Sequence, residues 1–461
     1  LSYDSGAGNG PFGFGWSLSL PAITRKTDKG LPQYYDSEDA DVFILSGAED
    51  LVPEFERDVT GNWVIENGRH VVHDTTRSVN GVIYNVRGYR PRIEGLFARI
   101  ERWTNAQGIS HWRSISPGNI TTLYGSTDES RIVDPADEIR IFSWLICESY
   151  DDKGNAIRYE YKKENSQGID ISRAHEANRD DNLRTANRYV KRIKYGNKSP
   201  RQTSEDLSAR QDWMFEVVFD YGEHYEENTN GDVQSVHCAD NLREWNLRQD
   251  TFSSYRAGYE VRTYRLCQRV LMFHHFDELE EENYLVRATH FAFSQKDVAS
   301  FITGVTQSGY KLIDGTYQQK SMPPTVFEYS QAVIQEEVLE VDAASLENLP
   351  QGLDNSRYQW VDLDGEGLSG ILTKQGGAWF YKRNQSALPI IDSTGNERTV
   401  ARFAPLECVA TMPSTANVSG VQQLLDLAGD GQLDVVEFDG PVPGFFERTP
   451  DEDWETHQPF T

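Results

Sequence analysis

Apolar residues that alternate with polar ones are the feature that most constrains how this chain can fold. The clearest run extends from Trp213 to Phe219, where every second residue is large and apolar. In an extended chain these side chains all point to one face, whereas a helix would scatter them around its axis. The run therefore predicts a half-buried β-strand.

The same signal recurs along the first 330 residues. A hairpin is predicted around the turn Asp151–Asn155. In its first strand, strict alternation places Trp144 and Ile146 on one face and Ile141 on the other. Further strands are expected at 42–45, 62–65, 81–87, 98–103, 189–195 and 284–293. With 11% aromatic residues and 36 glycines, the composition agrees with an all-β protein.

The opening of the chain is rich in glycine. Five glycines and one proline lie between Ser5 and Trp16 and allow tight reversals. Alternating apolar residues from Trp16 to Leu20 then predict a strand. Three of the glycines match the G-x-G-x-x-G spacing of a phosphate-binding loop, but no strand precedes them and no helix follows. We therefore expect a turn that packs against aromatic residues.

The charge of the chain limits its partners. The net charge is −27, from 72 acidic and 45 basic residues, and nucleic-acid binding needs a basic surface. We expect no nucleic-acid partner. No apolar run approaches the roughly 18 residues that span a bilayer, so no transmembrane helix is expected. The sequence begins at Leu1 without a methionine, and we expect it to be a fragment of a longer protein.

Two stretches near the C-terminus, residues 360–371 and residues 424–435, resemble each other. A repeat of this size indicates blades of a β-propeller. Each stretch resembles the FG-GAP repeat of integrin-type propellers, in which an acidic loop joins two strands.

The resemblance to FG-GAP repeats implies calcium ligands at the first, third, fifth and ninth loop positions. Each loop of this chain lacks one of the four carboxylates. The candidates that remain are Asp362, Asp364 and Glu366 in the first loop and Asp426, Asp430 and Asp434 in the second. We expect no cofactor, with calcium as the lesser alternative, and we expect these side chains to accept hydrogen bonds from backbone amides.

No catalytic residue is expected. His274 and His275 are adjacent, so on a strand they point to opposite faces and cannot bind one metal together. Glu278 and Glu280 have the Glu-x-Glu spacing of ADP-ribosyltransferases, but they lie in an acidic turn without a Ser-Thr-Ser motif. The sequence also contains no G-x-S-x-G motif.

Several stretches resemble one known family. They are Gly10–Pro21, Arg25–Pro32, Asp41–Gly47 and Tyr255–Phe276. These stretches are similar to the N-terminal domain shared by the SpvB virulence protein and the B components of Tc insecticidal toxin complexes. Residues 150–161 also resemble a single Tyr-Asp (RHS) repeat, a hairpin that stacks into spiral β-shells.

The resemblance implies an irregular, RHS-like β-shell domain over residues 1–330, a linker over 331–349 and a partial β-propeller over 350–461. It implies a non-catalytic component of a secreted toxin complex, extracellular after a stage in the cytoplasm. The shell would enclose a cytotoxic effector, and the propeller would dock on and gate a translocation channel. The implied partners are the C component, which completes the shell, and the A component, which forms the channel.

Two other functions stay open. The first is the N-terminal delivery region of an SpvB-like ADP-ribosylating toxin, whose enzyme domain would lie further downstream. The second is a calcium-dependent adhesion propeller.

Overall fold

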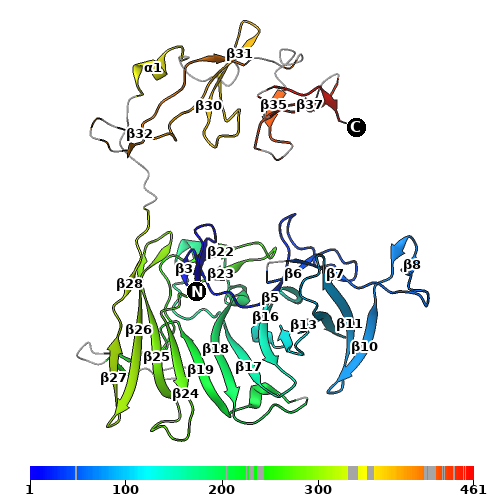
Figure 1. Cartoon of the computed structure of the whole chain (residues 1–461), viewed down its shortest axis with the longest axis vertical. Helices are drawn as coiled ribbons and strands as arrows, with labels where there is room; N and C mark the ends of the chain where they lie inside the picture. Colours follow the sequence, from blue (N-terminus) through cyan, green and yellow to red (C-terminus); the bar gives the residue numbers. More distant parts are fainter. Residues whose placement is uncertain are drawn as a thin grey trace. The chain divides into compact units, whose positions relative to one another are not determined.

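The computed structural model of the chain contains two compact units, Leu1–Tyr329 (unit 1) and Ser330–Thr461 (unit 2) (Figure 1). Both units consist of antiparallel strands with little helix, which confirms the predicted all-β class. The structure describes all residues except 47–48, 204, 225, 228–232, 236–242, 331–340, 350–357, 392, 394, 396, 410–412, 414–421, 428, 430, 440–441, 450, 452 and 461. Residues 331–340 of the expected linker thus lie outside the described residues, and the finer domain boundaries stay a prediction.

Unit 1 contains a closed ring of strands. They pair in the order β11–β12–β13–β14–β16–β5–β6–β7, and β7 pairs with β11 to complete the ring. The strands are β5 (Ala22–Arg25), β6 (Phe43–Leu45), β7 (Glu49–Pro53), β11 (Val82–Pro91), β12 (Arg99–Asn105), β13 (Ser110–Ile115), β14 (Thr121–Tyr124) and β16 (Asp137–Tyr150). Closure removes the unpaired sheet edges that an open sheet exposes.

Large apolar side chains fill the ring. Trp112 of β13 and Trp144 of β16 are fully buried, and their ring centroids are 5.9 Å apart. Phe43 of β6 meets both tryptophans edge-on. All eight strands contribute to this core, through Ile23, Phe43, Leu51, Tyr89, Ile100, Trp112, Tyr124, Ile141, Trp144 and Ile146.

A loop over residues 26–42 is fastened to the ring by ion pairs. The buried side chain of Arg25 donates to Asp36 at 2.6 Å and to Asp41 at 2.8 Å. Burial disfavours charge on Asp36, but Arg25 outweighs this effect and lowers the pKa of the carboxyl group. Arg87 of β11 pairs with Asp39 of the same loop. The loop is therefore a fixed part of the ring.

The predicted hairpin is confirmed, but one of its predicted faces is wrong. Ile141 joins Trp144 and Ile146 in the ring core, although strict alternation placed it on the opposite face. The reason is a β-bulge: β15 (Arg131–Asp134) pairs with β16 through Ile132↔Ser143 and then through Val133↔Ile141, so Phe142 is an extra residue. A bulge offsets the alternation by one position.

An open arm of strands continues from β16. Residues 143–145 of β16 pair with β5 in the ring, and residues 148–150 pair with β17 in the arm. The arm runs β17–β18–β19–β24–β25–β26–β27, with β28 on a second part of β26, and Figure 1 shows these strands side by side. The strands are β17 (Ala156–Lys163), β18 (Arg188–Asn197), β19 (Trp213–Asp220), β24 (Arg269–His274), β25 (Tyr284–Gln295), β26 (Ser300–Ile313), β27 (Thr316–Ser321) and β28 (Thr325–Val326).

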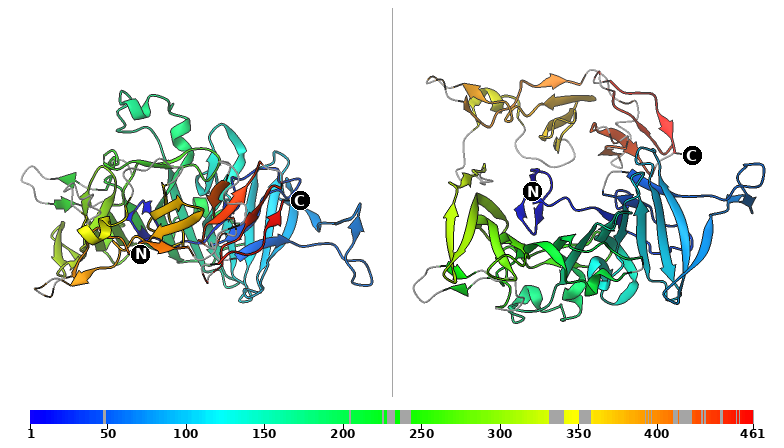
Figure 2. Two further views of the ribbon diagram at one scale, coloured as in Figure 1. Left: turned by 90° about the horizontal axis from the view of Figure 1, so that it is seen from above. Right: turned by 60° about the horizontal axis from the view of Figure 1, so that its bottom comes forward.

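Residues 4–20, which we call the N-terminal plug, cover the concave face of the arm (Figure 2). Phe12 is 4% exposed and packs edge-on against Phe219 and Phe291, as the predicted turn against aromatic residues requires. The strand predicted from Trp16 to Leu20 is wrong. β4 covers only Trp16–Ser17, because its partner β1 (Ser2–Tyr3) offers two residues for pairing.

The remaining elements of unit 1 are short. Two further strands of the plug are β2 (Asn9–Gly10) and β3 (Gly13–Phe14). A projecting hairpin and the strand after it are β8 (Ile65–Glu66), β9 (Arg69–His70) and β10 (Asp74–Val79). The others are β20 (Glu226–Glu227), β21 (Val233–Ser235), β22 (Phe252–Ser254) and β23 (Val261–Thr263), with the 3-10 turns Asp128–Ser130, Ala174–Glu176, Leu183–Ala186 and Leu207–Ala209.

Unit 2 contains two four-stranded antiparallel sheets and one short helix, α1 (Ala343–Leu346). The first sheet is β29 (Tyr358–Val361), β30 (Gly370–Gln375), β31 (Ala378–Lys382) and β34 (Glu407–Cys408), and the second is β35 (Gln422–Leu425), β36 (Asp434–Glu437), β37 (Gly444–Phe446) and β38 (Gln458–Pro459). A small hairpin pairs β32 (Ile390–Ile391) with β33 (Glu397–Arg398). Both sheets share one apolar core, in which Trp379 and Trp454 meet edge-on. A β-propeller stays a prediction.

Candidate functional site

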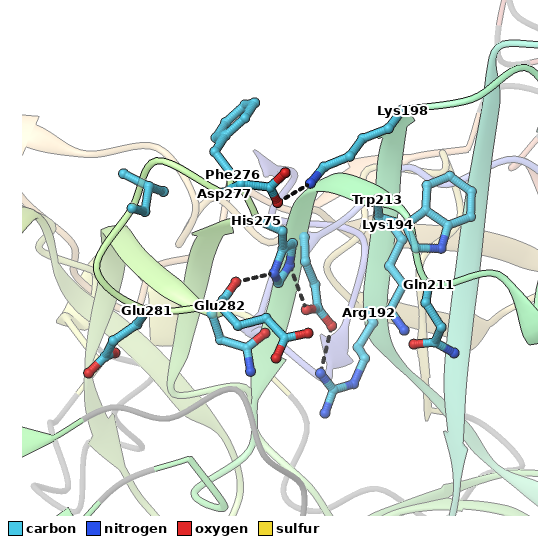
Figure 3. Close-up of a pocket in the computed structure, with 13 residues that line it drawn as sticks. Arg192, Lys194, Lys198, Gln211, Trp213, His275, Phe276, Asp277, Glu281 and Glu282 are labelled. Carbon is cyan, nitrogen blue, oxygen red and sulfur yellow. Dashed lines mark hydrogen bonds and ion pairs between the residues drawn. The ribbon is translucent and has the colours of Figure 1, made fainter.

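An open polar pocket of about 590 Å³ lies beside the ends of β18, β19 and β24 (Figure 3). Its two walls carry opposite charge, because basic side chains come from β18 and its C-terminal end and acidic ones from the turn between β24 and β25. The basic residues are Arg192, Lys194 and Lys198, and the acidic ones are Asp277, Glu281 and Glu282.

His275 lies between these walls and is held on both sides. Its Nε2 is 3.2 Å from a carboxylate oxygen of Glu216, and its Nδ1 is 2.8 Å from the carbonyl oxygen of Glu282. Glu216 also accepts a hydrogen bond of 2.6 Å from Arg192. The pocket is therefore built around a chain of charged hydrogen bonds, Arg192–Glu216–His275.

The partners of His275 define its protonation state. Both ring nitrogens face acceptors, so both carry a proton when both bonds form. Burial opposes the charged ring, but Glu216 and the Glu282 carbonyl outweigh it and raise the pKa of His275. An imidazolium has no lone pair with which to accept a proton. His275 therefore acts in this structure as a clamp between β19 and the β24–β25 turn.

The other residues singled out near this pocket lie apart from the clamp. His274 points to the opposite side of β24 and packs against Phe215, with ring centroids 5.0 Å apart. His275 follows the last residue of β24, and its ring contacts Glu216 and the Glu282 carbonyl instead. Glu278 and Glu280 are exposed in the β24–β25 turn. Asp277 of this turn forms an ion pair of 2.9 Å with Lys198 across the pocket.

The first acidic loop of unit 2 is closed by its own hydrogen bonds. Asp362 accepts from the backbone amides of Glu366 at 2.8 Å and Gly367 at 2.6 Å. Asp364 forms ion pairs with Arg383 at 2.7 Å and Arg448 at 2.6 Å. Glu366 also pairs with Arg383, at 3.0 Å, so all three carboxylates of this loop have partners within the protein.

The second acidic loop follows the same rule. Asp426 accepts from the amides of Gly429 at 2.7 Å and Gly431 at 3.0 Å, and the buried Asp434 accepts from Leu427 at 2.9 Å. Asp430 lies outside the described residues. In the part of the chain that the structure describes, no three metal-ligating side chains gather as a metal site would require.

Sequence reasoning missed a buried ionic clamp in the arm. Arg248 and Asp250 have no exposed side-chain surface and pair at 2.8 Å. Together they hold the N-terminal plug: Arg248 donates to the Gly10 carbonyl at 2.8 Å, and Asp250 accepts from Asn9 at 2.7 Å. These residues come from the polar stretch 222–250, which carries no period-two pattern. The one available signal was Trp245, an aromatic residue in that stretch that is 2% exposed.

The fold and these sites define the class of the protein as a β-sheet scaffold. Its charged side chains form ion pairs within the chain, as His275 does with Glu216 and Arg248 does with Asp250. No helix in the described part is long and apolar enough to cross a membrane.

The sequence matches one known protein family and several characterised relatives. Residues 1–276 match the family described as SpvB, Salmonella virulence plasmid 65kDa B protein. The mono(ADP-ribosyl)transferases SpvB of Salmonella typhimurium and Salmonella dublin are each 35% identical over 318 residues, which is 68% of this chain and 50% of the relative. The chain thus spans about half the length of these relatives.

Solved structures extend the similarity. A chain of the Photorhabdus luminescens Tc holotoxin pore matches with a TM-score of 0.77 and 29% identity over 99% of this chain and 20% of that chain. The TcdB2–TccC3–Cdc42 structure matches with 0.71 and 30% over 99% of this chain and 20% of that chain. The N-terminal domain of the effector SpvB from Salmonella typhimurium matches with 0.58 and 33%, over 67% of this chain and 92% of that domain.

The chain belongs to the SpvB family. The resemblance inferred from the sequence, to SpvB and to the Tc B component, is confirmed by both kinds of relative.

Proposed function

We propose that this chain is a non-catalytic structural component of a secreted toxin complex. Unit 1 forms part of a shell that encloses a cytotoxic effector, and unit 2 forms part of a propeller that docks on and gates a translocation channel. The observation that carries this proposal is how much of the chain aligns with each solved structure. The TcdB2–TccC3 complex aligns with 99% of the chain, and therefore with both units, whereas the SpvB N-terminal domain aligns with 67%.

The geometry of the chain supports a structural role. The ring has a packed aromatic core, and in the open pocket His275 pairs with Glu216 and Lys198 pairs with Asp277. Closed packing and satisfied charges suit a wall that must keep its shape, whereas catalysis needs a group held ready for a substrate.

The C component is the first partner to test. The gene that encodes this chain should be co-expressed with a C-component gene of the TccC3 kind. We expect the two proteins to purify together and the C-terminal region of the C component to resist added protease. A C component without its hypervariable C-terminal region is the matched control. Failure of the two proteins to co-purify would contradict the proposal.

A second candidate is the N-terminal region of an ADP-ribosylating toxin, and the 35% identity to SpvB over 318 residues favours it. The test is to incubate the purified gene product with labelled NAD and a cell extract. Transfer of label to an extract protein would support this candidate. Absence of label together with C-component binding would leave the shell proposal standing.

The proposal includes no bound metal and no catalytic side chain. A chelator should leave the melting temperature unchanged, because Asp362 and Asp426 accept hydrogen bonds from backbone amides. A fall in melting temperature would instead favour a calcium-dependent adhesion propeller.

A further inference from the structure

A cavity of about 280 Å³ lies between the N-terminal plug and the sheet of unit 1. Ile132, Leu145 and Tyr161 line it from the sheet, and Leu18 and Leu20 line it from the plug. Pockets with apolar walls and few polar groups bind apolar molecules. The walls therefore favour an apolar occupant.

The tyrosine hydroxyls of the wall are already bonded to the protein. The Tyr161 hydroxyl donates to the carbonyl of Ile146 at 2.8 Å, and the Tyr221 hydroxyl donates to the carbonyl of Val190 at 3.1 Å. These tyrosines therefore offer the cavity mainly their aromatic rings.

One charged residue, Arg188 of β18, also lines the cavity, and it is 7% exposed. Its closest bonds run from Nη1 to the carbonyl oxygens of Thr185, Ala186 and Asn187, at 2.7 Å, 3.2 Å and 3.0 Å. Its longer contacts, at 3.4 Å, go to the carbonyl of Asp128. Carbonyl groups satisfy N–H donors but carry no formal charge to balance the guanidinium.

Other buried arginines of this region differ from Arg188 in this respect. Each of them pairs with a carboxylate: Arg248 with Asp250, Arg265 with Glu164 and Arg269 with Asp220. Among the described residues, Arg188 has no carboxylate within ion-pair distance. Burial lowers its pKa to about 10, and the more distant carboxylates of Glu129 and Asp128 offset this effect only in part. It still carries its charge at neutral pH. A buried cation without a counter-ion is costly, and a bound anion would remove that cost.

We propose that this cavity binds an amphipathic monoanion, a fatty or aromatic carboxylate, with its carboxylate at Arg188 and its apolar body between the plug and the sheet. Charge complementarity selects an anion, and the apolar walls select a hydrocarbon or aromatic body. The site would use the ligand to fasten the plug. This inference does not depend on the proposed function, because it concerns a cavity within unit 1 alone.

The test compares octanoate with octanol, which has the same hydrocarbon chain without the charge. Titration calorimetry on the full chain should show octanoate binding at least about tenfold more tightly, as expected for one charge-assisted contact. Equal affinities, or no binding by either compound, would overturn the proposal. This comparison needs no variant, so it stands even where a substitution fails to fold.

Two substitutions locate the site. In Arg188→Gln the preference for octanoate over octanol should disappear. In Leu18→Trp, which fills the cavity from the plug, both compounds should bind at least about tenfold more weakly. Circular dichroism should confirm that each variant is folded. Octanoate binding that is unchanged in a folded Leu18→Trp variant would place the ligand elsewhere and overturn the proposal.

Discussion

The ring and the arm of unit 1 are parts of one continuous sheet, yet they bury their inner faces in different ways. The ring closes through β7 and β11, so its own strands supply the core, with Trp112 and Trp144 at the centre. The arm stays open, and coil segments cover its concave face. One of these segments is the N-terminal plug, which inserts Phe12.

The difference shows what an open sheet requires. Coil brings backbone groups that need partners, because no neighbouring strand bonds them. In the arm, a buried charge supplies such a partner, since Arg248 donates to the Gly10 carbonyl. Arg248 and Asp250 also bond the side-chain amide of Asn9. The ring also buries a charge, since Arg25 holds the 26–42 loop, but its apolar core comes from its own strands. We expect the two regions to respond differently when each is damaged.

The largest effect should come from the ring core. Trp144→Ala removes a fully buried side chain and leaves a cavity, which should lower the free energy of unfolding by about 4 kcal/mol. Urea unfolding measures this loss. The control is Trp360→Ala in unit 2, whose side chain is 49% exposed and should matter little. A similar loss in both variants would contradict the special role of the ring core.

The clamp of the arm should come next. Asp250→Asn leaves Arg248 buried without its counter-charge and should cost about 3 kcal/mol. Hydrogen exchange should rise in peptides of the N-terminal plug and stay unchanged in peptides of β12 and β13. Equal increases in both regions would mean that ring and arm unfold as one unit. The double variant Arg248→Met, Asp250→Leu should recover part of the loss, because it removes both charges.

A smaller effect should follow from Gly13, where the plug approaches the arm closely. Its φ is +91°, and a Cβ atom there would lie 2.8 Å from the carbonyl oxygen of Ser300. Gly13→Ala should cost about 2 kcal/mol in thermal or urea unfolding. Gly8→Ala is the matched control. Gly8 has a φ of +73° but no atom within 4 Å of its added Cβ, so it should cost about 1 kcal/mol. Equal costs would argue against tight docking of the plug.

The smallest effect should be the pH response of His275. Its pKa is raised in the folded state, so its stabilisation is complete below the unfolded pKa of about 6.5 and is lost as pH rises through the folded pKa. The partly exposed pair should contribute less than about 1 kcal/mol. Unfolding measured from about pH 6 to about pH 8.5 should show this decline, and His275→Gln should flatten it. An unchanged slope in the variant would assign the response to another group.

Much of the fold could be predicted from the sequence, because strands are marked by local patterns. The alternation from Trp213 to Phe219 became β19, and the turn at Asp151–Asn155 joins β16 to β17. The paired acidic loops of unit 2 were also visible, since each lies between two strands that pair with each other. The failures were local exceptions to a regular period, at the bulge of Phe142 and at the two-residue strand β4. The strand expected at 62–65 was also wrong, since of these residues only Ile65 lies in a strand, β8.

By itself the sequence determined many of the strand segments, that the chain is all-β and which family it resembles, because these properties depend on neighbouring residues. Only the tertiary structure decided that β16 pairs with β5 to close the ring, and that Asp250 bonds Asn9 across 241 positions of the chain. Such contacts depend on which distant segments meet, and a local pattern carries no information about its partner. The burial of Arg188 away from any carboxylate in contact is visible only in the structure for the same reason. An arginine in an unfolded chain is solvated, and only folding buries its charge.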